Sequence, residues 1–464
     1  MRHRDTRKCE ALFTVRLHAK GTCWGLAMTL STIGAVPSLA QISTPIIPPI
    51  GAPWNAQQVF ETPEFPQASD FRDPDETAPE DMPVKTRQHP GYEPVGIRSG
   101  SWMFNPSVTF GTIYDSNVFA SNTNPRGDTF AQARASLAGR SLWERHALSF
   151  QADVRTDQYL NYPGLNQTDA SIKARGRYDI RHDIAVLTNF QAAYLHEGVG
   201  SLSSPTGAVQ PTPYNYLTGD ITYRQEFNRW IVSLGGRIDS YDFGTTRAQN
   251  GTIIRQDSRD GQVYTAHGRV DYLLSPKLAI FSATEVNTRD IRGVPSQTLD
   301  SHGYRALAGV HLEVSRLVNA EIAAGYGQQT FDDPLISTIA GPTYRATIVW
   351  RPTRRIDVTF KAEQIVTQAT DTDSSGVKAD AAQLGIDYEL LRNTFVSVAG
   401  VYEHDTFVGQ NRRDNVYGSL AELKYLLNRF SSISLQHRYI RRGSSVPTSN
   451  YDKHEVGIRV TAQF

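Results

Sequence analysis

Cysteine is nearly absent from this chain. Its 464 residues include two cysteines, Cys9 and Cys23, and both lie in the first forty residues. If that segment is removed as a leader, the remaining chain has no disulfide, no thiol nucleophile and no thiolate ligand for zinc. The scarcity therefore excludes a disulfide-stabilised domain, a cysteine-dependent enzyme and a cysteine-based zinc site.

Net charge and long apolar runs are lacking as well. The chain has 47 basic and 47 acidic residues, which excludes a strongly basic nucleic-acid-binding protein. The mean hydropathy of −0.41 argues against a bundle of transmembrane helices. It leaves a membrane β-barrel open, because only every second residue of a spanning strand faces lipid. Length alone, at about 150 residues per domain, predicts about three domains.

Residues 1–40 are typical of a secretory signal peptide. Residues 1–20 carry six basic and two acidic side chains, and a mostly apolar run follows over 23–36. Small residues at Ser38 and Ala40 then form a cleavage site. A signal anchor that stays in the membrane is the alternative, but the apolar run is shorter than the roughly 20 residues needed to span a bilayer.

Residues 41–95 have the composition of a linker. Prolines such as Pro48 and Pro49 remove backbone donors, and nine acidic residues against three basic ones repel each other. We expect this Pro-rich acidic segment to be disordered in the periplasm. Two functional interpretations stay open beside disorder: a tether for a periplasmic partner and a short plug in a lumen.

From residue 96 to residue 464 the hydrophobicity alternates with a period of two. Over 169–180, the even positions are Ala, Ile, Ala, Gly, Tyr and Ile, whereas the odd positions are all polar. Eighteen segments follow this pattern, with bounds good to about two to four residues. They lie near residues 103–113, 129–139, 146–156, 169–180, 183–195, 216–227, 230–241, 262–273, 277–288, 303–314, 317–327, 342–351, 355–366, 379–390, 394–405, 415–426, 430–440 and 453–464.

The connections between these segments alternate between short and long. Short turns include 181–182 and 228–229, whereas long connections such as 114–128 and 196–215 are rich in Gly, Asn, Asp, Ser and Pro. Outer-membrane barrels have tight periplasmic turns and long extracellular loops. The sequence therefore predicts an all-β fold: a transmembrane, antiparallel, up-and-down β-barrel of about 18 strands (16–18) over 96–464, with both termini in the periplasm.

A soluble β-sandwich or propeller would also show alternation. Most of the segments run 10–12 residues, which suits tilted strands that cross a bilayer better than soluble strands of about five or six residues. Tyr264 and Tyr272 share one strand face eight residues apart, about the height of an apolar band. Aromatic rings at both edges of such a band favour the membrane barrel.

The opening of the alternating region resembles a known family. The run 96–107 contains an aromatic-x-Pro-x strand, and Tyr-Asp-Ser-Asn-Val-Phe follows at 114–119. This hairpin resembles the opening of the Putative beta-barrel porin 2 family of Gram-negative outer-membrane proteins. The resemblance implies an outer-membrane barrel over 96–464, in a family that sometimes accompanies exopolysaccharide export. Asp115 and Asn117 also suit an Asx-type turn at the first loop, so we interpret the motif as structural.

The last residue points to the same location. Phe464 ends an alternating strand, and a terminal aromatic looks like the recognition signal of the outer-membrane barrel assembly machinery. The expected partners are outer-membrane lipid, that machinery and, through the resemblance, polysaccharide-export components, with no nucleic acid. The expected location is the outer membrane of a Gram-negative bacterium.

The polar strand faces predict a charged lumen. A stripe of arginines that faces acids elsewhere on the wall would orient polar or anionic solutes such as acidic sugars. The alternative is that these charges pair across strands and simply fill the interior. The candidate lumen-lining residues are Arg175, Arg177, Arg237, Arg269, Arg305, Arg345, Asp239, Asp271, Glu313, Asp357, Lys361 and Asp387.

Catalytic motifs are missing from the sequence. It contains no Gly-x-Ser-x-Gly, no His-Glu-x-x-His and no phosphate-binding loop. Residues 371–376 begin like a calcium loop, but Ala382 stands where the bidentate glutamate belongs, and a loop tip is the simpler interpretation. We expect no enzymatic activity, no cofactor and no metal.

Two functions remain for such a barrel. The first is a porin-like conduit for polar or saccharide-like solutes, linked through the family resemblance to exopolysaccharide export. The alternative is a closed accessory barrel of an envelope or polysaccharide-secretion machine, which docks a periplasmic partner through residues 41–95.

Overall fold

The structure, a computed structural model, describes a defined part of the chain. The described residues are 83–85, 87, 89–201, 204–205, 207–293, 298–314, 317–367 and 376–464. The predicted signal peptide at 1–40, most of the predicted linker at 41–95 and the calcium-like segment before Gly376 lie outside them.

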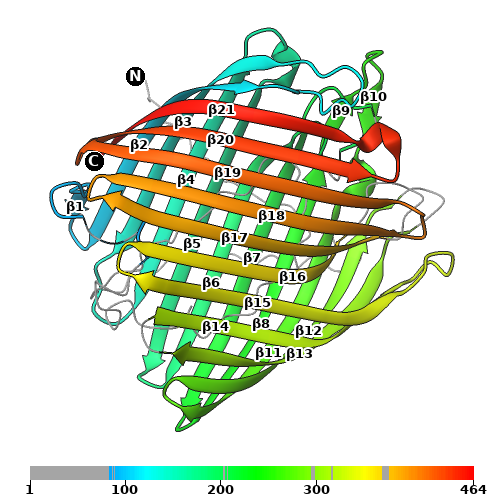
Figure 1. Cartoon of the computed structure of the whole chain (residues 1–464). Helices are drawn as coiled ribbons and strands as arrows, with labels where there is room; N and C mark the ends of the chain where they lie inside the picture. The colour runs from blue at the N-terminus through cyan, green and yellow to red at the C-terminus, as the bar shows by residue number, and fades with distance from the viewer. Residues whose placement is uncertain are drawn as a thin grey trace, which may run out of the picture. The chain divides into compact units, whose positions relative to one another are not determined.

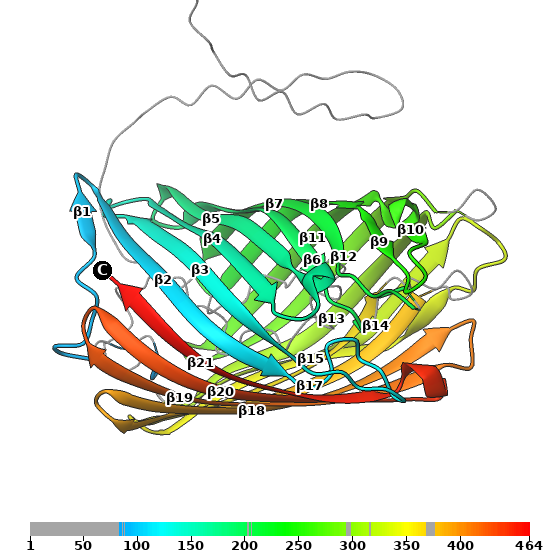
Figure 2. The ribbon, with the colours of Figure 1, turned by 90° about the horizontal axis from the view of Figure 1, so that it is seen from above.

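Eighteen antiparallel strands of the described chain form a closed barrel (Figure 1, Figure 2). Each strand pairs with the next one along the chain, and the last strand pairs with the first, with Phe110 opposite Val460. The barrel strands are β2 (Trp102–Asp115), β3 (Asp128–Ser141), β4 (Ala147–Tyr159), β5 (Gln167–Arg181), β6 (Ile184–Glu197), β7 (Thr212–Phe227), β8 (Trp230–Phe243), β11 (Gly261–Ser275), β12 (Leu278–Ile291), β13 (Ser301–Val314), β14 (Val318–Phe331), β15 (Ile339–Thr353), β16 (Ile356–Thr367), β17 (Gly376–Leu391), β18 (Thr394–Val408), β19 (Arg413–Asn428), β20 (Ser431–Ser444) and β21 (Tyr451–Gln463).

All eighteen predicted segments are strands, which confirms the predicted antiparallel barrel. The predicted bounds agree within two residues at the short turns, but several strands run further toward the long loops. β7 begins at Thr212 rather than near 216, and β20 ends at Ser444 rather than near 440. These extensions continue the ladder beyond the apolar band, where alternation of hydrophobicity no longer marks a strand.

Smaller elements lie at the two ends of the barrel. β1 (Ile97–Ser99) pairs with the start of β2, and β9 (Thr245–Arg247) pairs with β10 (Ile253–Arg255) in the loop after β8. The described long connections also hold three 3₁₀ turns: η4 (Pro163–Leu165), η5 (Asp257–Arg259), which follows β10 in the same loop, and η7 (Pro447–Ser449). No helix in the described ranges has the length and apolar character needed to cross a membrane.

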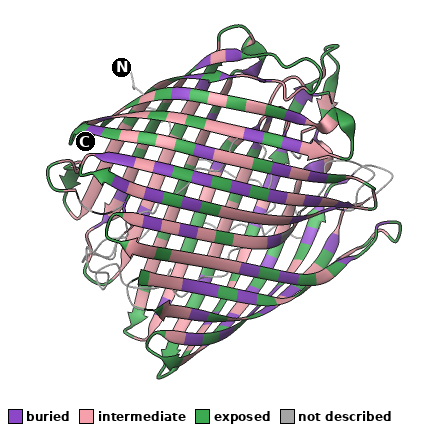
Figure 3. Cartoon of the chain, in the orientation of Figure 1, coloured by how far each residue is buried: buried purple, intermediate pink, exposed green. Residues whose placement is uncertain are grey.

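Buried and exposed residues alternate along the strands (Figure 3). In β12, for example, Phe281 and Ala283 are buried, whereas Ile280 and Val286 are exposed. Aromatic rings stand exposed on the apolar face near both strand ends, as predicted for the edges of a lipid-facing band. They include Tyr178, Phe227, Trp230, Trp350 and Tyr425 near the short turns, and Tyr264, Tyr304, Tyr326, Tyr344, Tyr402 and Tyr417 near the long loops.

Candidate lumen and its charged inner wall

The polar strand face is the concave inner face of the barrel. Arg269 on β11 contacts Glu321 on β14 at 3.0 Å, and Arg305 on β13 contacts Glu363 on β16 at 3.1 Å. Each pair reaches past two intervening strands, which side chains can do only on the concave side of a curved sheet. Strand alternation places all twelve predicted lumen-lining residues on this face.

One buried ion-pair cluster is centred on Arg269. Its guanidinium lies 2.7 Å from a carboxylate oxygen of Asp271 and 3.0 Å from one of Glu321. The same guanidinium stacks over the ring of Phe281, with its central carbon 3.8 Å from the ring centre. Two acids and an aromatic face therefore hold one buried cation.

A second buried cluster joins β12, β13, β15 and β16. Arg305 contacts Glu285 at 2.8 Å and Glu363 at 3.1 Å, and Arg345 contacts Glu363 at 2.6 Å. These two arginines and Glu285 are almost fully buried. Because each charge is satisfied by its neighbours, the cluster braces this part of the wall.

The wall over β3–β5 is different. Lys173 and Arg175 on β5 are exposed, and Arg134 on β3 keeps 47% of its side chain accessible although it contacts Asp153 at 2.5 Å. Lys361 on β16 is exposed as well. Among the described residues, no hydrogen bond or ion pair is found for the side chains of Lys173, Arg175 or Lys361. These side chains on the inner wall are therefore accessible to solvent.

The exposed inner charges share one sign. Between the two rims of the described barrel, the charged inner-face side chains that are exposed are all basic: Arg134, Lys173, Arg175 and Lys361. Most acids of this face are buried or half-buried and contact basic or hydroxyl side chains, but Glu226 near the turn after β7 is exposed, and the buried Asp405 lies beside Glu403 rather than in an ion pair within the described chain. The predicted stripe of arginines is thus divided, because Arg177 and Arg237 bond to Asp179 and Asp239 on their own strands.

The 114–119 motif is structural, as its sequence predicts. The backbone N–H of Asn117 donates to the Asp115 carboxylate at 2.9 Å, which is an Asx turn. The Asn117 side-chain amide donates to the carbonyls of Ser121 and Asp452 at 2.9 and 3.0 Å. Lys453 contacts the other Asp115 oxygen at 2.8 Å, so the motif ties the first loop to the last strand.

The first described residues form a strap, defined here as Pro83–Lys85, Arg87 and His89, against the inner wall near the short turns. Val84 is fully buried with Phe395 and Leu426, and its backbone N–H donates to Asp357. Lys85 contacts Asp387 at 2.8 Å. The strap thus occupies Asp357 and Asp387, two of the predicted lumen acids.

The remaining predicted lumen-lining residues differ in burial and in their contacts. Asp271 and Asp239 are buried partners of arginines, as described above, whereas Glu313 is half-buried beside the turn that follows β13. The sequence analysis did not single out Arg134, although it lies in phase with the other inner residues of its strand. The strap falls within residues 41–95, where the sequence analysis expected disorder and left a short lumen plug open, but it named none of the strap's contacts.

Solved structures of outer-membrane proteins match this chain at low identity. OpdL from Pseudomonas aeruginosa is 11% identical and covers 79% of this chain and 99% of its own, with a TM-score of 0.41. OccAB4 from Acinetobacter baumannii is 12% identical, with 81% and 100% covered and a TM-score of 0.41. The siderophore receptor PirA from the same organism is 7% identical, with 78% and 80% covered and a TM-score of 0.42.

The family comparison covers most of the barrel. No curated protein matches the sequence. The family described as Putative beta-barrel porin 2 matches over residues 89–464, which include every strand of the barrel. The chain therefore belongs to the Putative beta-barrel porin 2 family and is a porin-like outer-membrane barrel.

Proposed function

We propose that the barrel is a passive conduit for polar, saccharide-like solutes and that it favours anionic ones. The observation that carries this proposal is the set of exposed cations on the inner wall: Arg134, Lys173 and Arg175 on one side and Lys361 on β16. Fixed positive charge along a low-dielectric wall raises the local concentration of anions. Several of the buried acids cannot cancel this effect, because arginines and the strap already pair with them.

The proposal includes an orientation in the membrane. The short turns and both termini of the barrel face the periplasm, and the long loops face outward, because outer-membrane barrels keep their long loops outside. Family members sometimes accompany exopolysaccharide export, so an acidic polysaccharide fragment is a solute of suitable chemistry. Lipid contacts the apolar outer face between the two aromatic belts.

Conductance tests the conduit directly. Refolded full-length protein is added to a planar lipid bilayer under a potassium chloride gradient. We expect stepwise current. The reversal potential should have the sign of the chloride equilibrium potential, which indicates a preference for chloride over potassium. Absence of current from verified, folded protein overturns the conduit, and a cation-selective reversal potential overturns its preference for anions.

A closed accessory barrel is the second candidate, and the strap favours it. Val84 and Lys85 bind inner-wall residues near the short turns, at the rim that the orientation proposed above places in the periplasm. The docking hypothesis assigns residues 41–82 to a partner on that side. Deleting residues 41–82 keeps the strap and removes most of the linker. If the secretion and growth phenotypes of the deletion match those of the full chain, the docking role fails.

We also propose that Phe464 is recognised by the barrel assembly machinery. The Phe464 ring packs at a tilt against Phe430 with the ring centres 5.8 Å apart, and its backbone N–H donates to the Pro106 carbonyl at 3.1 Å. The ring is nevertheless half exposed on the outer face and is accessible to the assembly machinery. Replacing Phe464 by Ala should slow insertion into the outer membrane, followed as the conversion from unfolded to heat-modifiable barrel.

A further inference from the structure

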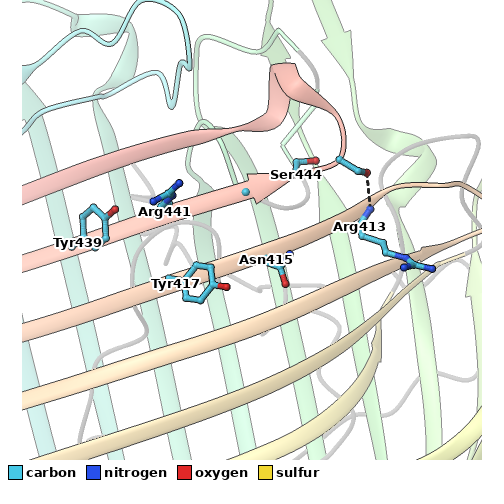
Figure 4. A pocket seen from close by; sticks show the side chains of 8 residues that line it. Arg413, Asn415, Tyr417, Tyr439, Arg441 and Ser444 are labelled. Carbon is cyan, nitrogen blue, oxygen red and sulfur yellow. Dashed lines mark hydrogen bonds between the residues drawn. The ribbon is translucent and has the colours of Figure 1, made fainter.

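The outer face of β19 and β20 carries a groove near the long loops (Figure 4). The groove has a volume of about 720 Å³. Gly443 forms part of its floor, and a Cβ atom added there would meet nothing within 4 Å. The residues lining it, apart from two serines, are Arg413, Asn415 and Tyr417 on β19 and Tyr439, Arg441 and Gly443 on β20.

Two arginines flank the glycine. The strand register places Asn415 opposite Gly443 and Tyr417 opposite Arg441, so Arg413 lies on the loop side of Gly443 and Arg441 on the other side. Both arginine side chains are exposed, and in the described chain neither guanidinium has a hydrogen bond or ion pair. Asp452, which faces Arg441 across the β20–β21 pairing, makes no ion pair with it.

The same face becomes apolar further from the loops. Tyr417 and Tyr439 lie at the boundary, and Leu423 lies opposite Leu435 in the lipid-facing band, where both leucines are exposed. A ligand in the groove therefore meets cations at one end and hydrocarbon-compatible surface at the other. This order matches an amphiphile with an anionic head group.

We propose that this groove binds the phosphate-bearing head group of a lipid in the outer leaflet, with the acyl chains along Leu423 and Leu435. Guanidinium groups bind phosphate through two parallel hydrogen bonds, and two guanidinium groups flank the open floor of the groove. A second copy of this chain fits less well, because a symmetric contact would bring identical arginines together. The proposal rests on the orientation proposed above, with the long loops outside.

Native mass spectrometry of full-length protein in a neutral detergent provides the test. The probes are a diphosphorylated glucosamine lipid (lipid A), phosphatidylcholine and inorganic phosphate. We expect retention of lipid A and no retention of phosphatidylcholine. The double variant Arg413→Gln/Arg441→Gln should weaken lipid A binding by about tenfold or more, since each basic residue at a membrane surface contributes to anionic-lipid affinity.

Two further variants separate the explanations. Arg392→Gln/Arg429→Gln removes the same charge from exposed arginines at the short turns and should bind lipid A like the parent. Gly443→Phe keeps both arginines but fills the groove, and it should weaken binding as well. Equal binding by the parent and Arg413→Gln/Arg441→Gln overturns the proposal, as does equal retention of phosphatidylcholine.

Competition and conductance complete the assignment. Displacement of lipid A by millimolar inorganic phosphate alone would show a simple phosphate site and would overturn a lipid site. The groove lies outside the lumen, so its variants should leave channel current unchanged. If the full-length parent protein binds lipid A but carries no current, the conduit proposal fails and the lipid site is retained.

Discussion

The inner wall over β11–β16 and the inner wall over β3–β5 use similar charges in opposite ways. Over β11–β16, Arg269, Arg305 and Arg345 are buried and each contacts at least one carboxylate. Over β3–β5, Lys173 and Arg175 are exposed and have no ion-pair partner among the described residues. The first wall is held together mainly by its charges, with Lys361 as an exposed exception, whereas the second presents Lys173 and Arg175 to the lumen.

This difference separates structural charge from functional charge. A buried ion pair is expensive to break, because its surviving partner stays desolvated. An exposed cation contributes little to stability, yet in the proposed conduit it would act on every solute that passes. Stability and ion selectivity should therefore respond to different variants, and four experiments follow from this separation.

The largest stability effect is expected at Arg305. Arg305→Met leaves Glu285 without its ion-pair partner and Glu363 with Arg345 alone, so the free energy of unfolding should fall by about 3–5 kcal/mol. Urea unfolding of the refolded barrel, followed by tryptophan fluorescence, measures it. Arg175→Met is the matched control and should unfold at the parent's urea concentration. Equal midpoints for the two variants would remove the distinction between the walls.

The largest effect on transport is expected on the opposite wall. Lys173→Glu/Arg175→Glu reverses two exposed inner charges, and the chloride-to-potassium permeability ratio should fall by at least about twofold. The reversal potential in a salt gradient reports this ratio. Arg413→Glu/Arg441→Glu makes the same charge change on the outer wall and should leave it unaltered. A similar shift in both variants would mean that the inner cations do not set selectivity.

The fold was predictable because it depends on local pattern. Period-two alternation places each side chain on one face, and this alone located all eighteen strands and the inner position of Arg269 or Asp357. The short turns were located closely, since the apolar face runs up to them. The long-loop ends of the strands were located less well, because the apolar outer face stops short of them. At the start of β7 the buried aromatic Tyr214 lies on the inner face, and Pro213 and Asn215 take the outer positions.

Whether each charged side chain of the inner face is buried in an ion pair or exposed could not be predicted from this pattern. Arg305 and Glu363 are 58 residues apart and meet only because the closed sheet curves. Whether an inner arginine is buried or exposed depends on that curvature and on neighbours several strands away. The strap shows the same limit, since nothing in the sequence near Val84 marks Phe395 and Leu426 as its contacts.

A change of intermediate size, in single-channel conductance, is expected when the strap is disturbed. Lys85→Glu places a like charge against Asp387, whose contact with Lys85 is partly exposed and worth about 1 kcal/mol or less. Because the strap lies on the inner wall near the short turns, its release should raise single-channel conductance. Deletion of 41–82, which retains the strap, is the control and should conduct like the full chain. Unchanged conductance for Lys85→Glu would mean that the strap does not narrow the path.

The smallest effect is expected at Arg134, which has the same chemistry as Arg305 in the opposite setting. Arg134 contacts Asp153 at 2.5 Å, but nearly half of its side chain is accessible to water. Arg134→Met should therefore lower the free energy of unfolding by less than about 1 kcal/mol, because water and salt screen an exposed pair. That loss should vanish at about 1 M salt, whereas the loss in Arg305→Met should persist. If Arg134→Met proves as destabilising as Arg305→Met, then charges also brace the wall over β3–β5. The exposed cations there would then be structural rather than reserved for solute selectivity.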